Sequence, residues 1–105
     1  MLDPKHVHKY LDLSTAHITG EDMAKLNAEG EEGIIPCAPY RYGVILFVLF
    51  HDSPSDKHNW IRTLKEAGYS DALQTLYIAA WTDKVDMIRL DQDSEVSVNL
   101  PTFDW

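Results

Sequence analysis

Cysteine, long apolar runs and signal-peptide features are scarce or missing in this sequence, and each shortage excludes a class of protein. A single cysteine, Cys37, cannot form an internal disulfide, which is typical of proteins in a reducing compartment. The longest apolar run, residues 44–50, is far shorter than the roughly 20 residues of a membrane-spanning helix. The first residues lack the apolar core and the cleavage site of a secretory signal peptide. We therefore expect a cytoplasmic protein that does not insert into a membrane.

Positive charge is also scarce. The sequence has 17 Asp and Glu against 9 Lys and Arg, which gives a formal net charge of −8 and disfavours direct binding to nucleic acid. The acids cluster, since residues 21–33 hold five acids and one lysine, and residues 83–105 hold six acids and two basic residues. Two interpretations stay open: a solvated surface that keeps the protein soluble, and an acidic face shaped for a basic partner.

The size and composition indicate one folded domain over residues 1–105. A chain of 105 residues is too short for two independent cores. Its hydrophobic fraction of 45% is too high for an intrinsically disordered protein. The sequence contains no internal repeat and no low-complexity segment.

Local patterns predict a first strand followed by a helix. Residues 9–15 alternate in part between apolar and polar side chains, which indicates a strand. Thr19 is suited to cap a helix start, and Asp22 stands where the acid of a capping box is expected. Gly30 is a typical residue just after a helix end, so a helix is predicted between Thr19 and Gly30.

The middle of the chain predicts a loop, a central strand and a second helix. Residues 31–43 contain two glycines and two prolines without a helical period, which indicates a long loop. Residues 44–50 are all apolar without alternation, the pattern of a strand covered on both faces. Ser53 and Pro54 are typical of a helix start, and the helix is predicted to end near residue 67.

The last third predicts further strands. Residues 75–81 form another apolar strand, residues 82–84 turn the chain, and residues 85–90 return as its antiparallel partner. Residues 96–98 are a candidate for a short fifth strand. The predicted order is β-α-β-α-β-β, and the predicted fold class is α+β: a two-layer sandwich of two helices on a mixed sheet of four or five strands.

One candidate for catalysis lies at the end of the first predicted strand. Ser14 or Thr15 would be the nucleophile, His17 the base, and Asp12 the group that orients the imidazole. Strand alternation places Asp12 and Ser14 on one face. The alternative is that these side chains cap the strand end around a hydrogen-bonded histidine. No Cys-x-x-Cys or His-x-x-x-His spacing occurs, so we expect no metal and no cofactor.

Cysteine and aromatic side chains give weaker candidates. Cys37 would be a nucleophile if its pKa were lowered, and otherwise a small buried apolar residue. Tyr40, Arg41 and Tyr42 have a composition typical of protein interfaces and of surfaces that stack a base, or they pack at the edge of the core. Trp105 belongs to an apolar tail that we expect to pack against the domain.

Two motifs near the ends of the chain carry a family resemblance. Residues 11–18 read LDLSTAHI and residues 100–105 read LPTFDW, and the pair Tyr42 and Gly43 fits the same pattern. The chain resembles a family of small uncharacterised proteins of bacteria, plasmids and phages with a Ser-Thr-Ala-His segment and a final Leu-Pro-Thr-aromatic-Asp-Trp motif. The resemblance implies one domain of mobile-element origin and no known activity. It further implies a shared site, or a clasp in which Asp104 bonds the first motif.

The leading functional hypothesis is a non-enzymatic acidic protein of phage or mobile-element type. It would dock a basic host protein, with inhibition as one use and a nucleic-acid-binding protein as one kind of target. The predicted contact residues are acidic or belong to the aromatic segments: Glu29, Glu31, Glu32, Asp91, Asp93, Glu95, Tyr40, Arg41, Tyr42, Asp104 and Trp105. The alternative is a small hydrolase or nucleotide-handling enzyme that uses Ser14, Thr15 and His17. A third hypothesis is a homodimer formed through a sheet edge.

Overall fold

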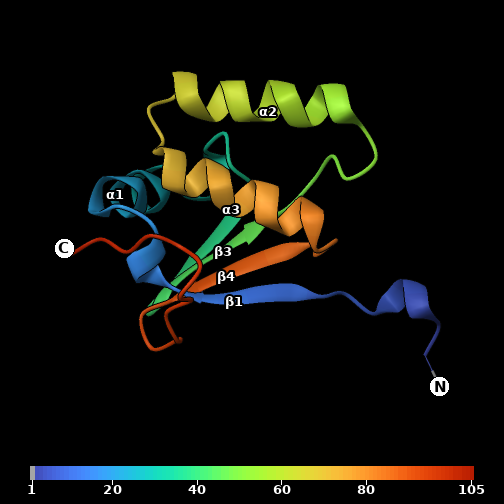
Figure 1. Ribbon diagram of the computed structural model, residues 1–105, viewed down its shortest axis with the longest axis horizontal. Helices are drawn as coiled ribbons and strands as arrows, with labels where there is room; N and C mark the ends of the chain where they lie inside the picture. The colour runs from blue at the N-terminus through green and yellow to red at the C-terminus, as the bar shows by residue number, and fades with distance from the viewer. Residues whose placement is uncertain (1) are drawn as a thin grey trace.

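The computed structural model describes residues 2–105 and shows an α+β fold with a mixed sheet of four strands. Its α-helices all lie on one side of the sheet (Figure 1). The main elements, in chain order, are β1 (Tyr10–Ser14), α1 (Gly20–Glu29), β2 (Cys37–Tyr40), β3 (Gly43–Phe47), α2 (Pro54–Glu66), α3 (Asp71–Thr82) and β4 (Met87–Asp91). Short 3-10 turns add η1 (Pro4–His6), η2 (Thr15–His17) and η3 (Gly30–Glu32). The predicted fold class and mixed sheet are confirmed.

The strand order in the sheet is β1-β4-β3-β2, so the last strand lies between the first and the third. β4 pairs in parallel with β1 and antiparallel with β3, and β2 pairs antiparallel with β3. Alternate residues of the central strands, such as Leu46 in β3 and Ile88 in β4, are fully buried in the core on the helical side. The other face of the sheet is more open, since Ile45 is half-buried and Phe47 is 38% exposed. The prediction that residues 44–50 are covered on both faces is therefore wrong.

The two predicted helix starts are confirmed. The Thr19 hydroxyl accepts a hydrogen bond from the Asp22 N–H, and the Asp22 carboxylate accepts one from the Thr19 N–H, which is the expected capping box. Ser53 caps α2 by accepting from the Asp56 N–H, and Pro54 occupies the first turn. Asp22 also accepts hydrogen bonds from the backbone and the hydroxyl of Ser70, so this buried carboxylate joins the starts of α1 and α3.

The predicted strand at residues 75–81 is wrong, because these residues form most of α3. The Ser70 hydroxyl accepts from the Leu73 N–H and starts the helix there. From that start the buried apolar side chains follow a helical period along one face: Ala72, Leu73, Leu76, Tyr77, Ala80 and Trp81. A short apolar run is typical of both a buried helix and a buried strand, and the missed cap at Ser70 would have distinguished them.

The remaining differences concern strands and their pairing. The predicted loop at residues 31–43 contains η3 and β2, and β2 forms a hairpin with β3. Residues 85–90 largely form β4, but this strand pairs with β1 and β3. Within the part of the chain that the structure describes, residues 96–98 are not a strand. The order is β-α-β-β-α-α-β, with three α-helices where two were predicted. None of the helices in residues 2–105 has the length and apolar character needed to cross a membrane.

Candidate functional site

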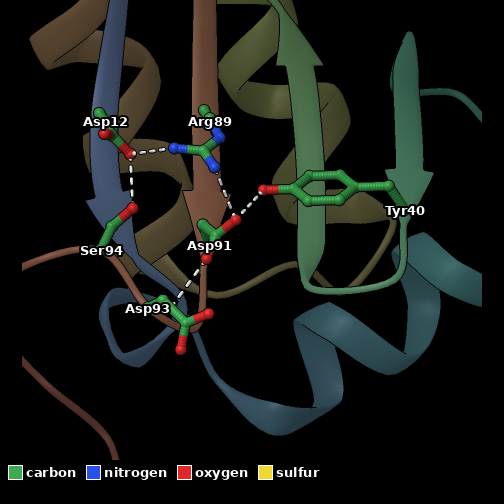
Figure 2. A network of polar contacts seen from close by, with 6 residues as sticks. All are labelled: Asp12, Tyr40, Arg89, Asp91, Asp93 and Ser94. Atoms are coloured by element: carbon green, nitrogen blue, oxygen red, sulfur yellow. Dashed lines mark hydrogen bonds and ion pairs between the residues drawn. The ribbon is translucent and has the colours of Figure 1, made fainter.

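A polar network occupies one end of the open sheet face, centred on Arg89 of β4 (Figure 2). The Arg89 guanidinium donates to Asp12 Oδ1 at 3.2 Å and to Asp91 Oδ2 at 2.9 Å. Tyr40 Oη donates to the same Asp91 oxygen at 2.5 Å. Ser94 Oγ donates to Asp12 Oδ1 at 2.5 Å. The network therefore joins β1, β2, β4 and the turn after β4.

The strand register explains why these side chains meet. Asp12 of β1 stands opposite Arg89 of β4, and Asp91 of β4 stands opposite Gly43 of β3, which in turn stands opposite Tyr40 of β2. Residues paired across neighbouring strands share a face of the sheet. The Tyr40 side chain extends across β3 to reach Asp91 (Figure 2). The position in β3 that this side chain crosses must be a glycine, Gly43. A Cβ at Gly43 would lie 1.8 Å from the Leu90 carbonyl oxygen.

Hydrogen bonding holds Asp91 in its charged form. The pKa of Asp91 lies below its ordinary value, first because of the Tyr40 hydroxyl, then because of the Asp93 N–H and the Arg89 guanidinium. The pKa of Tyr40 is raised, first by burial and then by its bond to Asp91. At neutral pH this pair is a phenol that donates to a carboxylate. The Asp91 carboxylate also fixes the turn after β4, since its Oδ1 accepts from the Asp93 N–H at 2.8 Å.

The network lines an acidic hollow on the surface. The hollow has a volume of about 460 Å³, and its lining residues are Asp12, Arg89, Asp91, Asp93, Ser94 and Glu95. Four carboxylates therefore surround one guanidinium, which leaves a local net charge of −3. Of the predicted contact residues, this hollow brings together Asp91, Asp93 and Glu95.

The C-terminal tail docks on the first motif through His17. This side chain is fully buried, with 0% exposed. Its Nε2 accepts from the Ser97 N–H at 2.8 Å, so its Nδ1 carries the proton and donates to the Pro101 carbonyl oxygen at 2.8 Å. The Phe103 N–H donates to the Ala16 carbonyl oxygen at 2.8 Å. The clasp expected from the two end motifs is therefore present, and a histidine ring forms its centre.

The clasp differs from the expected one in its contacts. Asp104 is exposed, and within residues 2–105 its carboxylate makes no hydrogen bond with the first motif. Trp105 instead donates from its indole N–H to the Ile18 carbonyl oxygen at 3.0 Å. The prediction that the tail packs against the domain is confirmed, whereas the predicted bond from Asp104 is wrong.

The proposed catalytic residues are close in sequence but face different partners. Asp12 is bound to Arg89 and Ser94 on the open face, and both ring nitrogens of His17 are bound by the tail. Ser14 Oγ accepts from the Ala16 N–H at the start of η2. The structure therefore does not bring these groups together as nucleophile, base and orienting acid.

The first acidic segment lies elsewhere on the molecule. Glu29 ends α1, where it accepts from the Tyr69 hydroxyl at 3.2 Å, and Glu31 and Glu32 belong to η3, which packs against β2. No ion pair or hydrogen bond in the described chain joins this segment to the hollow. Cys37 is buried beside it, and its pKa is raised by burial and by the charges of Glu29 and Glu31, which disfavours a nucleophilic thiolate.

A second pocket opens between the tail, α1 and the β2–β3 hairpin, with a volume of about 420 Å³. It brings together Tyr40, Arg41, Tyr42 and Trp105 from the predicted contacts with Ser14 and Thr15 from the first motif. Sequence reasoning missed Asn27 and Gln92, which also line it, and missed Arg89 and Ser94 in the hollow. Arg89 alone carried a signal, as one of two basic residues in the acidic last segment.

Comparisons with known proteins point to a family and to no activity. No curated protein and no solved structure matches the chain. Within residues 2–105, no group of three or more His, Cys, Asp or Glu residues is arranged to hold a metal ion. A family model described as the C-terminal domain of a family of unknown function (DUF5983) matches residues 10–105. Because this match covers most of the chain and both end motifs, the chain belongs to this uncharacterised family.

Proposed function

We propose that this domain is a non-enzymatic binding protein that docks a basic segment of a partner protein on the open sheet face. The observation that carries the proposal is the hollow around Arg89, where four carboxylates face one guanidinium. Arg89 is already paired with Asp12 and Asp91. Asp93 and Glu95 are exposed and form no ion pair within the described chain. Their charges are therefore available to a lysine or arginine from outside.

An apolar row next to the hollow supports a partner segment of mixed character. Tyr10, Met87 and Phe47 stand opposite one another across β1, β4 and β3, one row away from Ile45 and Arg89. Tyr10 is 53% exposed, and the α-helices lie on the opposite side of the sheet, above it in the view of Figure 1. An interface is typically built from an apolar centre with charged groups around it. A basic segment with one apolar face matches both the row and the hollow.

We extend this proposal to the kind of target, which is a protein that binds nucleic acid. A protein that binds nucleic acid presents rows of basic side chains to phosphates, and the carboxylates of the hollow would occupy those side chains instead. Docking there would inhibit the target. We further propose an origin in a phage or mobile element of bacteria, supported by the resemblance carried by its two end motifs. A protein that acts inside a bacterial cell in this way would be cytoplasmic.

The test is capture of a partner from a bacterial lysate by the tagged domain, at low and at high salt. The proposal expects a specific basic partner whose capture weakens at high salt. The double variant Asp93→Lys with Glu95→Lys should lose it, because both carboxylates of the hollow that lack an ion-pair partner in residues 2–105 are reversed in charge.

A matched control separates the hollow from overall charge. The double variant Glu31→Lys with Glu32→Lys makes the same change in net charge on η3 and should still capture the partner. Equal loss in both double variants would show a general charge effect and contradict docking at the hollow. Capture that survives Asp93→Lys with Glu95→Lys would contradict it as well.

A further inference from the structure

We propose that the second pocket, between the tail and the β2–β3 hairpin, binds a free nucleoside monophosphate. The pocket is separate from the acidic hollow, and the inference does not depend on the proposed function. It is built from four parts of the chain: the end of β1 with η2 and α1, the β2–β3 hairpin, Gln92 directly after β4, and the last residues of the tail. Its volume of about 420 Å³ lies near the lower end of the range for small-molecule sites. One mononucleotide is a ligand of suitable size.

Aromatic rings form part of the pocket wall. Tyr42 lies on the hairpin turn and is 41% exposed, and Trp105 lies on the tail and is 61% exposed. Phe103 and Tyr40 also line the pocket. Exposed aromatic faces that meet in one pocket are typical of sites that stack a nucleobase, since every base has a π-face.

The charge of the pocket is opposite to that of the protein. Arg41 is the one charged side chain among the lining residues, in a protein with a net charge of −8. Its guanidinium lies 5.2 Å from the centre of the Tyr42 ring, so the cation is held beside an aromatic face. Within residues 2–105 no carboxylate pairs with Arg41. An arginine in this setting suits a phosphate attached to a stacked base.

Neutral polar groups complete the chemistry that a base requires. The side-chain amides of Asn27 and Gln92 line the pocket and form no hydrogen bond within the described chain. Each amide offers a donor and an acceptor in one plane, which matches the edge of a nucleobase. Ser14 and Thr15 line the same pocket, and each brings a hydroxyl that can donate to phosphate or ribose. Both end motifs therefore contribute to one site.

A free mononucleotide is favoured over a nucleic-acid strand. The net charge of −8 opposes the approach of a polyanion, whereas one phosphate meets only the local field of Arg41. The hollow next to the hairpin, with its net −3, repels further phosphates along a strand. The site thus suits a free nucleoside monophosphate, either as the product of nucleotide hydrolysis or as a free metabolite.

The test is a titration with the ribonucleoside 5′-monophosphates, followed by tryptophan fluorescence and by calorimetry. Stacking on Trp105 should quench the emission, and inorganic phosphate alone should not. Trp105→Phe should remove the quench, because Trp60 and Trp81 lie in the α2–α3 cluster. Quenching that persists in Trp105→Phe would overturn the placement of the base, and absence of binding for every monophosphate up to about 1 mM would overturn the proposal.

Variants of exposed residues resolve the contacts without disturbing the fold. Arg41→Ala should weaken binding of the monophosphate at least about tenfold and change binding of the free nucleoside less than about twofold. Asn27→Ala and Gln92→Ala should weaken both ligands alike. Arg62→Ala, on the outer face of α2, is the matched control and should change neither. Equal effects of Arg41→Ala and Arg62→Ala would overturn the role of Arg41, and tighter binding of a short oligonucleotide than of its monophosphate would overturn the free-nucleotide assignment.

Discussion

Replacement of His17 by alanine should release the C-terminal tail and destabilise the whole domain. The ring is fully buried and makes two hydrogen bonds of 2.8 Å, one from the Ser97 N–H and one to the Pro101 carbonyl oxygen. Both partners lie on the tail, whereas His17 itself ends η2. Removal of the ring therefore removes two of the hydrogen bonds that hold the tail on the first motif.

The magnitude follows from these contacts. Each hydrogen bond contributes about 1 kcal/mol net, so the two together contribute about 2 kcal/mol. The space left by the ring adds about 1–2 kcal/mol, because the surroundings relax only in part. The expected loss is about 3–4 kcal/mol in the free energy of unfolding, which corresponds to a fall of roughly 12–20 °C in Tm for a domain of this size.

Urea unfolding and amide hydrogen exchange are the assays. The Ser97 amide should lose its protection in His17→Ala. His17→Gln, whose side-chain oxygen reaches the position of Nε2, should restore that protection in part. His17→Asn places a donor near the position of Nδ1 and should restore only the bond to Pro101. His58→Ala, on an exposed residue of α2, is the control and should change stability by less than about 0.5 kcal/mol. Equal stability of His17→Ala and His58→Ala would refute the reasoning.

Further predictions concern the open face and the core. Tyr40→Phe removes the first cause of the lowered Asp91 pKa, so this pKa should rise in a carbon NMR titration. A lowered pKa gives stability that is lost as pH falls through it, so urea unfolding should show a smaller loss between pH 7 and pH 3 in Tyr40→Phe than in the native protein. Cys37 should react with a disulfide reagent near pH 8 at least about tenfold more slowly in the folded protein than in the denatured chain, because burial raises its pKa. Gly43→Ala should cost about 3 kcal/mol or more in urea unfolding, since its Cβ would overlap the Leu90 carbonyl.

The helix starts were predictable because their contacts are local. The Thr19 and Ser53 caps each bind an N–H three residues ahead, so the pattern is complete within a few letters of sequence. Ser70 makes the same kind of cap before α3. It was missed because the apolar residues 75–81 indicated a strand, and a run of that length fits either structure.

Strand pairing was not predictable in the same way. β4 joins the sheet between β1 and β3, and its partners lie far away in the sequence: Tyr10 pairs with Met87, and Phe47 pairs with the same residue from the other side. The sequence of β4 alone does not indicate which strands it pairs with. Tertiary packing decides which strands pair with β4. The helices cover one face of the sheet and form the core there, while the other face stays open.

The sequence indicated many of the residues in the two candidate sites. It did not indicate which of these residues lie together on one surface. Contacts were expected at Asp91, Asp93 and Glu95 and at Tyr40, Tyr42 and Trp105, but these residues divide between two surfaces. Asp91, Asp93 and Glu95 share the hollow because the Arg89 side chain points to the open face. That direction depends on the register of β4, which local sequence does not specify.

The two surfaces depend on different anchors along the same C-terminal segment, which separates their tests. The turn at Asp93 is held by Asp91, through the Asp93 N–H and the Ser94 N–H, before the chain reaches the tail. The tail beyond it is held by His17, and loss of this tether should displace Trp105 from its place in the pocket. His17→Ala should therefore weaken mononucleotide binding while partner capture by the hollow persists. The double variant Asp93→Lys with Glu95→Lys should have the opposite effect, because both residues line the hollow and neither lines the pocket. Parallel loss of both activities in either variant would contradict two separate sites.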